Sequence, residues 1–471
     1  MHPNGYHSQV VANTTTSVVT FSILSPDASL SYDRIKLRLE EYRTLLASDS
    51  DTIELSTENG RSVVCRKQTK EMEEYLDQAE ILLQDVVQSR NISTLVILHH
   101  LRDLTEVLDK LNLYDECRLT GNCAFDLAEA LGRRSLEFRQ EQAETLALIA
   151  GLSVYQPRAR TLFIQAISIC EEVVANNASH SNKFTFLNVL NRAGYWGPDD
   201  LRAQWLGQAV QLMTNELLPT MVHPWTRSII YYNYGSSLYH LKQYSSAVAA
   251  YDEAISIRRI LATNNTARYN RKLAWALRNK GIALTSLGKY DGAIVAYTEA
   301  LEICTTISAQ DPLQCNKLMA KTLYSYGSAL GNLNQFSEAA AVEKRAVSLF
   351  RNLVQTGLEY TELLCSTLHN YGNNSHALGE YAEAVHAYQE SILLRRALAA
   401  TDTEERDLIR SLHGIAHAFF ALGKYIEAND AANEALERGH RKVLEVCRYA
   451  PHFESCFVCQ RAIIPDLPPN V

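Results

Sequence analysis

Proline is scarce in the part of the chain where it would break a helix. The 471 residues include 11 prolines, but only Pro312 lies between Trp225 and Ala450. Proline inside a helix removes a backbone hydrogen bond and clashes with the preceding turn. This long stretch can therefore hold long, uninterrupted helices.

Long apolar runs are also missing. The most apolar stretch near the start, SVVTFSIL at residues 17–24, is too short and too polar for a membrane helix or a signal segment, and no positively charged segment precedes it. The sequence therefore predicts a cytoplasmic protein without a membrane partner.

The charge and the cysteines exclude two further classes. A net charge of −8 and a pI near 6.0 disfavour nucleic acid, whose backbone calls for a concentrated Lys/Arg surface. The ten cysteines are scattered, Cys117, Cys170, Cys304 and Cys365 among them, and do not form a regular framework. Reduced, packed thiols are therefore predicted instead of disulfides.

Motifs for catalysis are absent. The sequence contains no G-x-x-x-x-G-K-[ST] loop for nucleotides, no H-E-x-x-H zinc helix and no G-x-S-x-G turn with a nucleophilic serine. We therefore expect a protein that is not an enzyme, with no cofactor and no small-molecule substrate.

What the sequence does contain is a repeat, seen best at residues 277–301, LRNKGIALTSLGKYDGAIVAYTEAL. Leu277, Gly281 and Leu284 are spaced to share one face of a helix. Gly288 suits a left-handed turn, which would end that helix. A second helix would follow, with small alanines that allow the two helices to approach closely.

The same pattern recurs from Tyr231, Leu323, Leu368 and Leu412. These five units resemble the tetratricopeptide repeat family, with L-x-x-x-G on a first helix and Y-x-x-A-x-x-x-Y-x-x-A on a second. The spacing of 45 to 46 residues between the unit glycines exceeds the family's usual 34. In this respect the units resemble the repeats of kinesin light chain and of large signalling NTPases.

The spacing continues upstream of the clear units. One small residue followed by an aliphatic or aromatic residue returns every 42 to 46 residues, at positions 124, 166, 209, 254, 300, 346, 391 and 435. This predicts eight helix pairs in series. The expected fold is all-α, a solenoid of stacked antiparallel helix pairs forming a right-handed superhelix.

We divide the chain accordingly. Residues 1–30 are predicted to be a disordered arm, and residues 31–90 an N-terminal cap or a degenerate repeat, with a polar loop between two helices. Diverged pairs would fill residues 91–225, the five clear units residues 226–445, and a C-terminal cap and tail residues 446–471. Prolines and glycines before Trp225 favour a kink or boundary there.

Candidate binding residues follow from the helical wheel. In a stacked pair the first helix would line a concave groove. The residues two and three before each glycine and one after it would lie on the free face of that helix, toward the groove. Two before it stand Asn233, Asn279 and Asn370, with Ser325 and Gly414 interrupting the row. The row resembles the asparagine ladder of the O-linked N-acetylglucosamine transferase repeats, which implies peptide binding; alternatively, these amides cap or bridge neighbouring helices.

The flanking positions add aromatic and basic groups, which are common interface anchors. The residues of this set predicted to bind a peptide are Tyr232, Arg278, Tyr324, His369, Asn373, His413 and His417. For each tyrosine the competing interpretation is contact with the next helix. Lys280 stands alone beside its glycine, so the Lys/Asn arrangement of chaperone-tail receptors is not reproduced.

Metal sites are not predicted. His369, His376, His413 and His417 lie on adjacent first helices, yet no cysteine or carboxylate accompanies them at a fixed spacing. Zinc binding by Cys456 and Cys459 of the tail is left open.

The function predicted is therefore a non-enzymatic scaffold or adaptor that binds a protein, as a peptide or helical segment, in its concave groove. One alternative is the sensor array of a signalling NTPase-type protein that lacks its catalytic domain. Another is an enzyme built by the N-terminal third, where His99, His100, Asp103 and Glu106 cluster.

Overall fold

A computed structural model describes residues 26–46, 52–56, 62–66, 69–88, 94–133, 135, 137–217, 220–264, 266–309, 311–398 and 402–447. The chain divides into two compact units, unit 1 at residues 1–223 and unit 2 at residues 224–471. The predicted break before Trp225 lies at this division.

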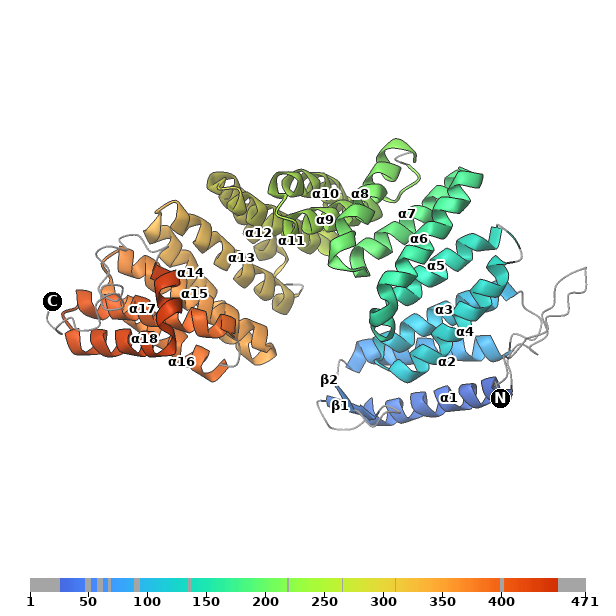
Figure 1. The fold of residues 1–471 in the computed structure, drawn as a ribbon, viewed down its shortest axis with the longest axis horizontal. Coiled ribbons are helices and arrows are strands. Elements are labelled where there is room, and N and C mark those ends of the chain that lie inside the picture. The colour runs from blue at the N-terminus through green and yellow to red at the C-terminus, as the bar shows by residue number, and fades with distance from the viewer. Residues whose placement is uncertain are drawn as a thin grey trace, which may run out of the picture. The chain divides into compact units, whose positions relative to one another are not determined.

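Unit 1 is built from helices that follow one another along the chain (Figure 1). They are α1 (Pro26–Leu46), α2 (Thr69–Gln88), α3 (Thr94–Lys110), α4 (Tyr114–Gly132), α5 (Glu137–Ala150), the 3-10 helix η1 (Ser153–Arg158), α6 (Ala159–Asn176), α7 (His180–Trp196) and α8 (Asp199–Asn215).

Two predictions for unit 1 were wrong. Helix α1 begins at Pro26, inside the predicted arm of residues 1–30, because proline suits the first turn of a helix, where its missing N–H is not needed. The predicted polar loop contains a two-stranded antiparallel hairpin, β1 (Thr52–Ser56) and β2 (Ser62–Arg66), in which Thr52 pairs with Arg66. The remainder of the arm lies outside the described residues.

Unit 2 repeats the helix pair five times. Its elements are α9 (Pro224–His240), α10 (Tyr244–Asn264), α11 (Thr266–Ser286), α12 (Tyr290–Ile307), α13 (Pro312–Asn332), α14 (Phe336–Leu353), the 3-10 helix η2 (Val354–Thr356), α15 (Leu358–Ala377), α16 (Tyr381–Leu398), α17 (Asp402–Ala421) and α18 (Tyr425–Cys447). Each odd-numbered helix packs against the even-numbered helix that follows it, and α11, α13, α15 and α17 also pack against the even-numbered helix that precedes them. The prediction of an α-solenoid of antiparallel pairs is confirmed.

The small residues whose spacing defines the repeat lie in the core. All eight have a fully buried side chain with 0% exposure, on the second helix of each pair from α4 to α18: Ala124, Ala166, Ala209, Ala254, Ala300, Ala346, Ser391 and Ala435. A larger side chain at these positions would push the paired helices apart. The register deduced from spacing alone therefore holds through the diverged part of the chain.

In four of the five pairs of unit 2, the glycine of the repeat pattern lies against a side chain of the second helix. A Cβ atom added to Gly281 would lie 2.5 Å from the ring of Tyr297, and one added to Gly372 would lie 2.7 Å from the ring of Tyr388. The first helix can therefore approach the tyrosine of the second only when it has no side chain at that position.

In all five units, one residue of the turn between the paired helices has a left-handed backbone conformation. Glycine supplies it at Gly288, Gly379 and Gly423, with φ between 71° and 79°, whereas Lys242 and Asn334 take the same place with φ of 60° and 59°. A left-handed conformation costs an ordinary residue about 1 kcal/mol. The strain therefore falls mainly on Lys242, since asparagine adopts this conformation more readily than other non-glycine residues.

We expect Lys242→Gly to stabilise the protein by about 1 kcal/mol, because glycine adopts the left-handed turn without strain. The measurement is the denaturant midpoint of unfolding. Gln243→Gly is the matched control, since Gln243 lies in the same turn and has no positive φ to relieve. A lower midpoint for Lys242→Gly would contradict the account of this turn.

Among the described residues, none of the helices is both long enough and apolar enough to cross a membrane.

Candidate peptide-binding face

The ten predicted binding residues lie on the first helices of unit 2: α9, α11, α13, α15 and α17. Nine of their side chains are half-buried, and that of Asn373 is exposed. We call the surface formed by these ten residues the first-helix face. It presents amides, phenols and imidazoles, together with the guanidinium of Arg278.

Two of the predicted residues meet across neighbouring first helices. The side-chain amide of Asn279 on α11 donates a 2.7 Å hydrogen bond to the hydroxyl oxygen of Tyr232 on α9. A guanidinium N–H of Arg278 donates to Asn279 Oδ1 at 3.3 Å, a long contact. Asn279 therefore bridges two helices, as the alternative interpretation of the asparagine row expected.

The other two asparagines of the row differ from Asn279. Nδ2 of Asn233 is buried and has no hydrogen-bond partner among the described residues. Asn370 is half-buried and likewise makes no side-chain hydrogen bond within the part of the chain that is described. An unsatisfied buried amide costs about 1–3 kcal/mol, so Asn233 would gain from a partner supplied by a ligand.

A chain of hydrogen bonds joins the C-terminal half of the face. The hydroxyl of Tyr388 donates to Asn373 Oδ1 at 2.6 Å, Asn373 Nδ2 lies 3.2 Å from His369 Nε2, and His369 Nδ1 lies 3.3 Å from the Ser411 hydroxyl. Burial is the main cause that lowers the pKa of His369, and Arg395 lowers it further. His369 is therefore neutral at pH 7, with Nδ1 as its donor and Nε2 as its acceptor.

The two histidines of α17 lie one helical turn apart. The ring centroids of His413 and His417 are 4.6 Å apart. No group of three or more histidine, cysteine or acidic side chains suited to a metal occurs in the described residues. Cys456 and Cys459 lie outside them.

Sequence reasoning missed one polar residue beneath the face. Glu343 of α14 occupies the position that Tyr251, Tyr297 and Tyr388 occupy in three of the other four repeats of unit 2, under the glycine of its pair. Its side chain is fully buried, Oε2 accepts a 2.8 Å hydrogen bond from Asn374, and Oε1 has no partner in the described structure. The departure from tyrosine in the repeat was the signal that could have found it.

Burial raises the pKa of Glu343 to about 8, and the hydrogen bond from Asn374 only partly opposes that rise. The carboxyl is therefore largely protonated at neutral pH. A neutral acid tolerates an apolar surrounding that a carboxylate does not.

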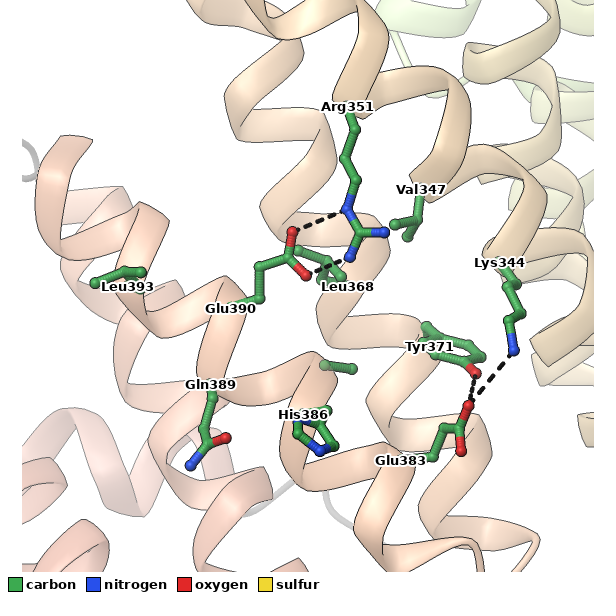
Figure 2. A pocket seen from close by; sticks show the side chains of 11 residues that line it. Lys344, Val347, Arg351, Leu368, Tyr371, Glu383, His386, Gln389, Glu390 and Leu393 are labelled. Atoms are coloured by element: carbon green, nitrogen blue, oxygen red, sulfur yellow. Dashed lines mark hydrogen bonds and ion pairs between the residues drawn. The ribbon is translucent and has the colours of Figure 1, made fainter.

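A cavity of about 570 Å³ opens on the other side of the repeats, between the second helices α14 and α16 (Figure 2). Its rim carries an ion pair between Arg351 and Glu390 at 2.5 Å, and Glu383 accepts from both Lys344 and the Tyr371 hydroxyl. The rim charges neutralise one another. The cavity therefore has no unpaired carboxylate to attract a cation.

Three of the four side chains in the charged cluster of the N-terminal third lie close to an oppositely charged or polar side chain. His99 Nε2 lies 3.0 Å from Glu141, His100 Nδ1 lies 3.8 Å from Asp85, and Glu106 pairs with Lys110 on its own helix. These contacts link α3 to its neighbours. The arrangement supports a structural role for the cluster.

The fold and the first-helix face define a helical repeat protein built from stacked pairs. Residues 226–306 and 364–402 each match the family described as tetratricopeptide repeat. These two segments of unit 2 carry tetratricopeptide repeats.

Among solved structures, one is similar to the chain in fold and others are similar to parts of it. The apo form of RapI shares 11% identity, with 78% of this chain and 95% of that chain covered, at a TM-score of 0.54. Kinesin light chain TPR-like repeats of Podosopora anserina share 16% identity over 46% of this chain and 96% of theirs, at a TM-score of 0.36. YrrB, described as a TPR protein with an unusual peptide-binding site, shares 16% identity, with 47% of this chain and 92% of that chain covered, at a TM-score of 0.32.

None of the curated proteins matches the sequence. The repeats and the fold support a protein-interaction scaffold as the general class.

Proposed function

We propose that the protein is a non-enzymatic adaptor that binds an extended peptide of a partner protein on the first-helix face of unit 2. The single observation that carries the proposal is the unsatisfied amide of Asn233 on that face. An amide can both donate to and accept from a peptide backbone, so it can hold a ligand whatever its side chains are.

The surroundings of this amide suit a peptide. Asn370 offers a second amide three first helices further along, and Tyr324 lies between them on α13. Aromatic and amide groups supply contact area and hydrogen bonds at low conformational cost, as in other peptide-binding surfaces. The name of YrrB shows that a tetratricopeptide-repeat protein can have a peptide-binding site.

The test is a selection of displayed random dodecamer peptides against the full chain, followed by titration of the selected peptides. Asn233→Ala/Asn370→Ala is expected to weaken their binding about tenfold, since two backbone hydrogen bonds of about 0.5–1.5 kcal/mol each are lost. Thermal unfolding checks that the variant is folded, because the side chains of both asparagines are half-buried.

Thr298→Ala/Leu393→Ala is the matched control, since both side chains are exposed on second helices. Equal weakening by this control, or unchanged binding by the asparagine variant, would contradict the proposal.

A further inference from the structure

The connection between α1 and α2 differs from the turns of the clear repeats. Residues 47–68 join these two helices and contain the hairpin β1–β2, whereas short turns, such as residues 287–289, join the paired helices of unit 2. The pairs of unit 2 stack with the short turn alone, so stacking does not require a hairpin. The hairpin is therefore an added element, and it lies at the C-terminal end of α1 (Figure 1).

The hairpin has too few strands to be stable by itself. It consists of the five-residue strands β1 and β2, and no third strand pairs with either of them within the described residues. Its contacts with described helices are mainly those of β1 with α1. A two-stranded hairpin is only marginally stable in water, and an open edge presents backbone N–H and C=O groups to a further strand. The hairpin is therefore suited to accept one more strand.

The middle residues of the two strands decide which edge can accept a second copy of the chain. Glu54, in the middle of β1, lies opposite Val64, in the middle of β2. When two identical strands pair antiparallel over all five residues, the middle residue of one lies opposite the same residue of the other. Pairing through β1 would therefore oppose two glutamates, whereas pairing through β2 would oppose two valines. Opposed like charges destabilise a sheet, and β-branched pairs stabilise it.

The other residues of β2 also suit pairing with a second copy. The same register places Val63 opposite Cys65 and Ser62 opposite Arg66, so no like charges meet. Proteins commonly protect an open edge with a proline or with a charged residue. Strand β1 has such a charge at its middle, but β2 has no proline and its one charged residue is the last. The edge of β2 is therefore the unprotected one.

We propose that two copies of this chain associate through β2 and form a four-stranded antiparallel sheet in the order β1–β2–β2–β1. The proposal is independent of peptide binding by unit 2, because the hairpin belongs to unit 1. Strands of this length bury too little surface for a permanent dimer, so the association is weak and increases with concentration. One assembly then holds two first-helix faces.

The first test is sedimentation velocity of the full chain over a dilution series. We expect the mass to rise with concentration from 52.9 kDa toward twice that value. Val64→Lys opposes two lysines and is expected to weaken self-association about tenfold, because a favourable cross-strand pair becomes a repulsive one. Glu54→Lys is the matched control, since it introduces the same residue at the opposite register position on the other edge. Its self-association is expected to equal that of the parent.

A cysteine cross-link locates the contact. Cys65 is replaced by serine, and a cysteine is placed at Val64 in one protein and at Glu54 in another. Opposed Cα atoms in an antiparallel ladder are about 4.5–5.5 Å apart, a distance that a disulfide spans. Under mild oxidation we expect covalent dimers from Val64→Cys/Cys65→Ser. Glu54→Cys/Cys65→Ser is expected to give no more than Cys65→Ser alone.

Several results would overturn the proposal. One is a mass that stays at 52.9 kDa over the whole dilution series, and another is self-association that Val64→Lys leaves unchanged. Cross-linking through Glu54→Cys in place of Val64→Cys would assign the contact to β1. Absence of cross-linking at both positions would leave the open edge to an extended segment of a different protein. Circular dichroism checks that the helices of each variant are folded.

Discussion

The protein is expected to lose stability as the pH rises from about 5 to about 8, and Glu343→Gln to remove most of that loss. The pKa of Glu343 is raised to about 8 in the fold by burial, whereas an unfolded glutamate has its ordinary value near 4.5. Between these two values the folded state holds a proton that the unfolded state has released. Stability is therefore full below about pH 4.5, falls as the pH rises, and becomes constant above about pH 8.

The full loss from this residue corresponds to roughly 5 kcal/mol as an upper bound. The measurement is the free energy of unfolding in denaturant at several pH values for the parent and for Glu343→Gln, which stays neutral and can still accept from Asn374. Glu338→Gln is the control, since Glu338 is an exposed glutamate of the same helix. A pH slope that persists in Glu343→Gln would show that other groups cause it.

Glu343→Tyr extends the same argument. Tyrosine fills this position in three other repeats of unit 2, so the substitution restores the aromatic contact with the glycine of the pair. The variant is expected to be more stable than the parent at pH 8.

Gly281→Leu is expected to lower the free energy of unfolding by about 3 kcal/mol or more, because even a Cβ atom at this position would lie 2.5 Å from the Tyr297 ring. The ring is fully buried and has little room to move. The measurement is thermal or denaturant unfolding of the full chain.

Gly292→Ala is the matched control within the same helix pair. Its added Cβ would lie 3.5 Å from Leu284, which is an ordinary contact. The higher helix propensity of alanine is therefore expected to raise the free energy of unfolding by about 0.5–1 kcal/mol. If the two substitutions destabilised equally, the register of this pair would be wrong.

Most of the fold could be predicted from the sequence because the repeat constrains it many times over. Ala166 and Ala209 belong to segments that no longer match the repeat pattern, yet both are fully buried where the spacing placed them. The hairpin β1–β2 could not be predicted this way, since it occurs once and its pairing depends on contacts between residues that share no repeat.

The candidate site could be predicted only in part. The helical wheel placed the ten residues on first helices, but it could not show which amides already have partners. Asn279 is bonded to Tyr232, whereas Asn233 is not satisfied, and this difference depends on the reach of side chains between neighbouring helices. Glu343 stands out for the same reason, because burial and the absence of a counter-ion are properties of packing.

The most direct test of the central claim is photo-crosslinking of the selected peptides to the full chain. A benzophenone amino acid is placed at Ser328, a half-buried residue of α13 beside the first-helix face, or at Leu393, which is 67% exposed on α16. Crosslinking from Ser328, competed by unlabelled peptide, with little from Leu393, is the predicted result. Efficient crosslinking from Leu393 and none from Ser328 would contradict the claim and place the ligand at the cavity between α14 and α16.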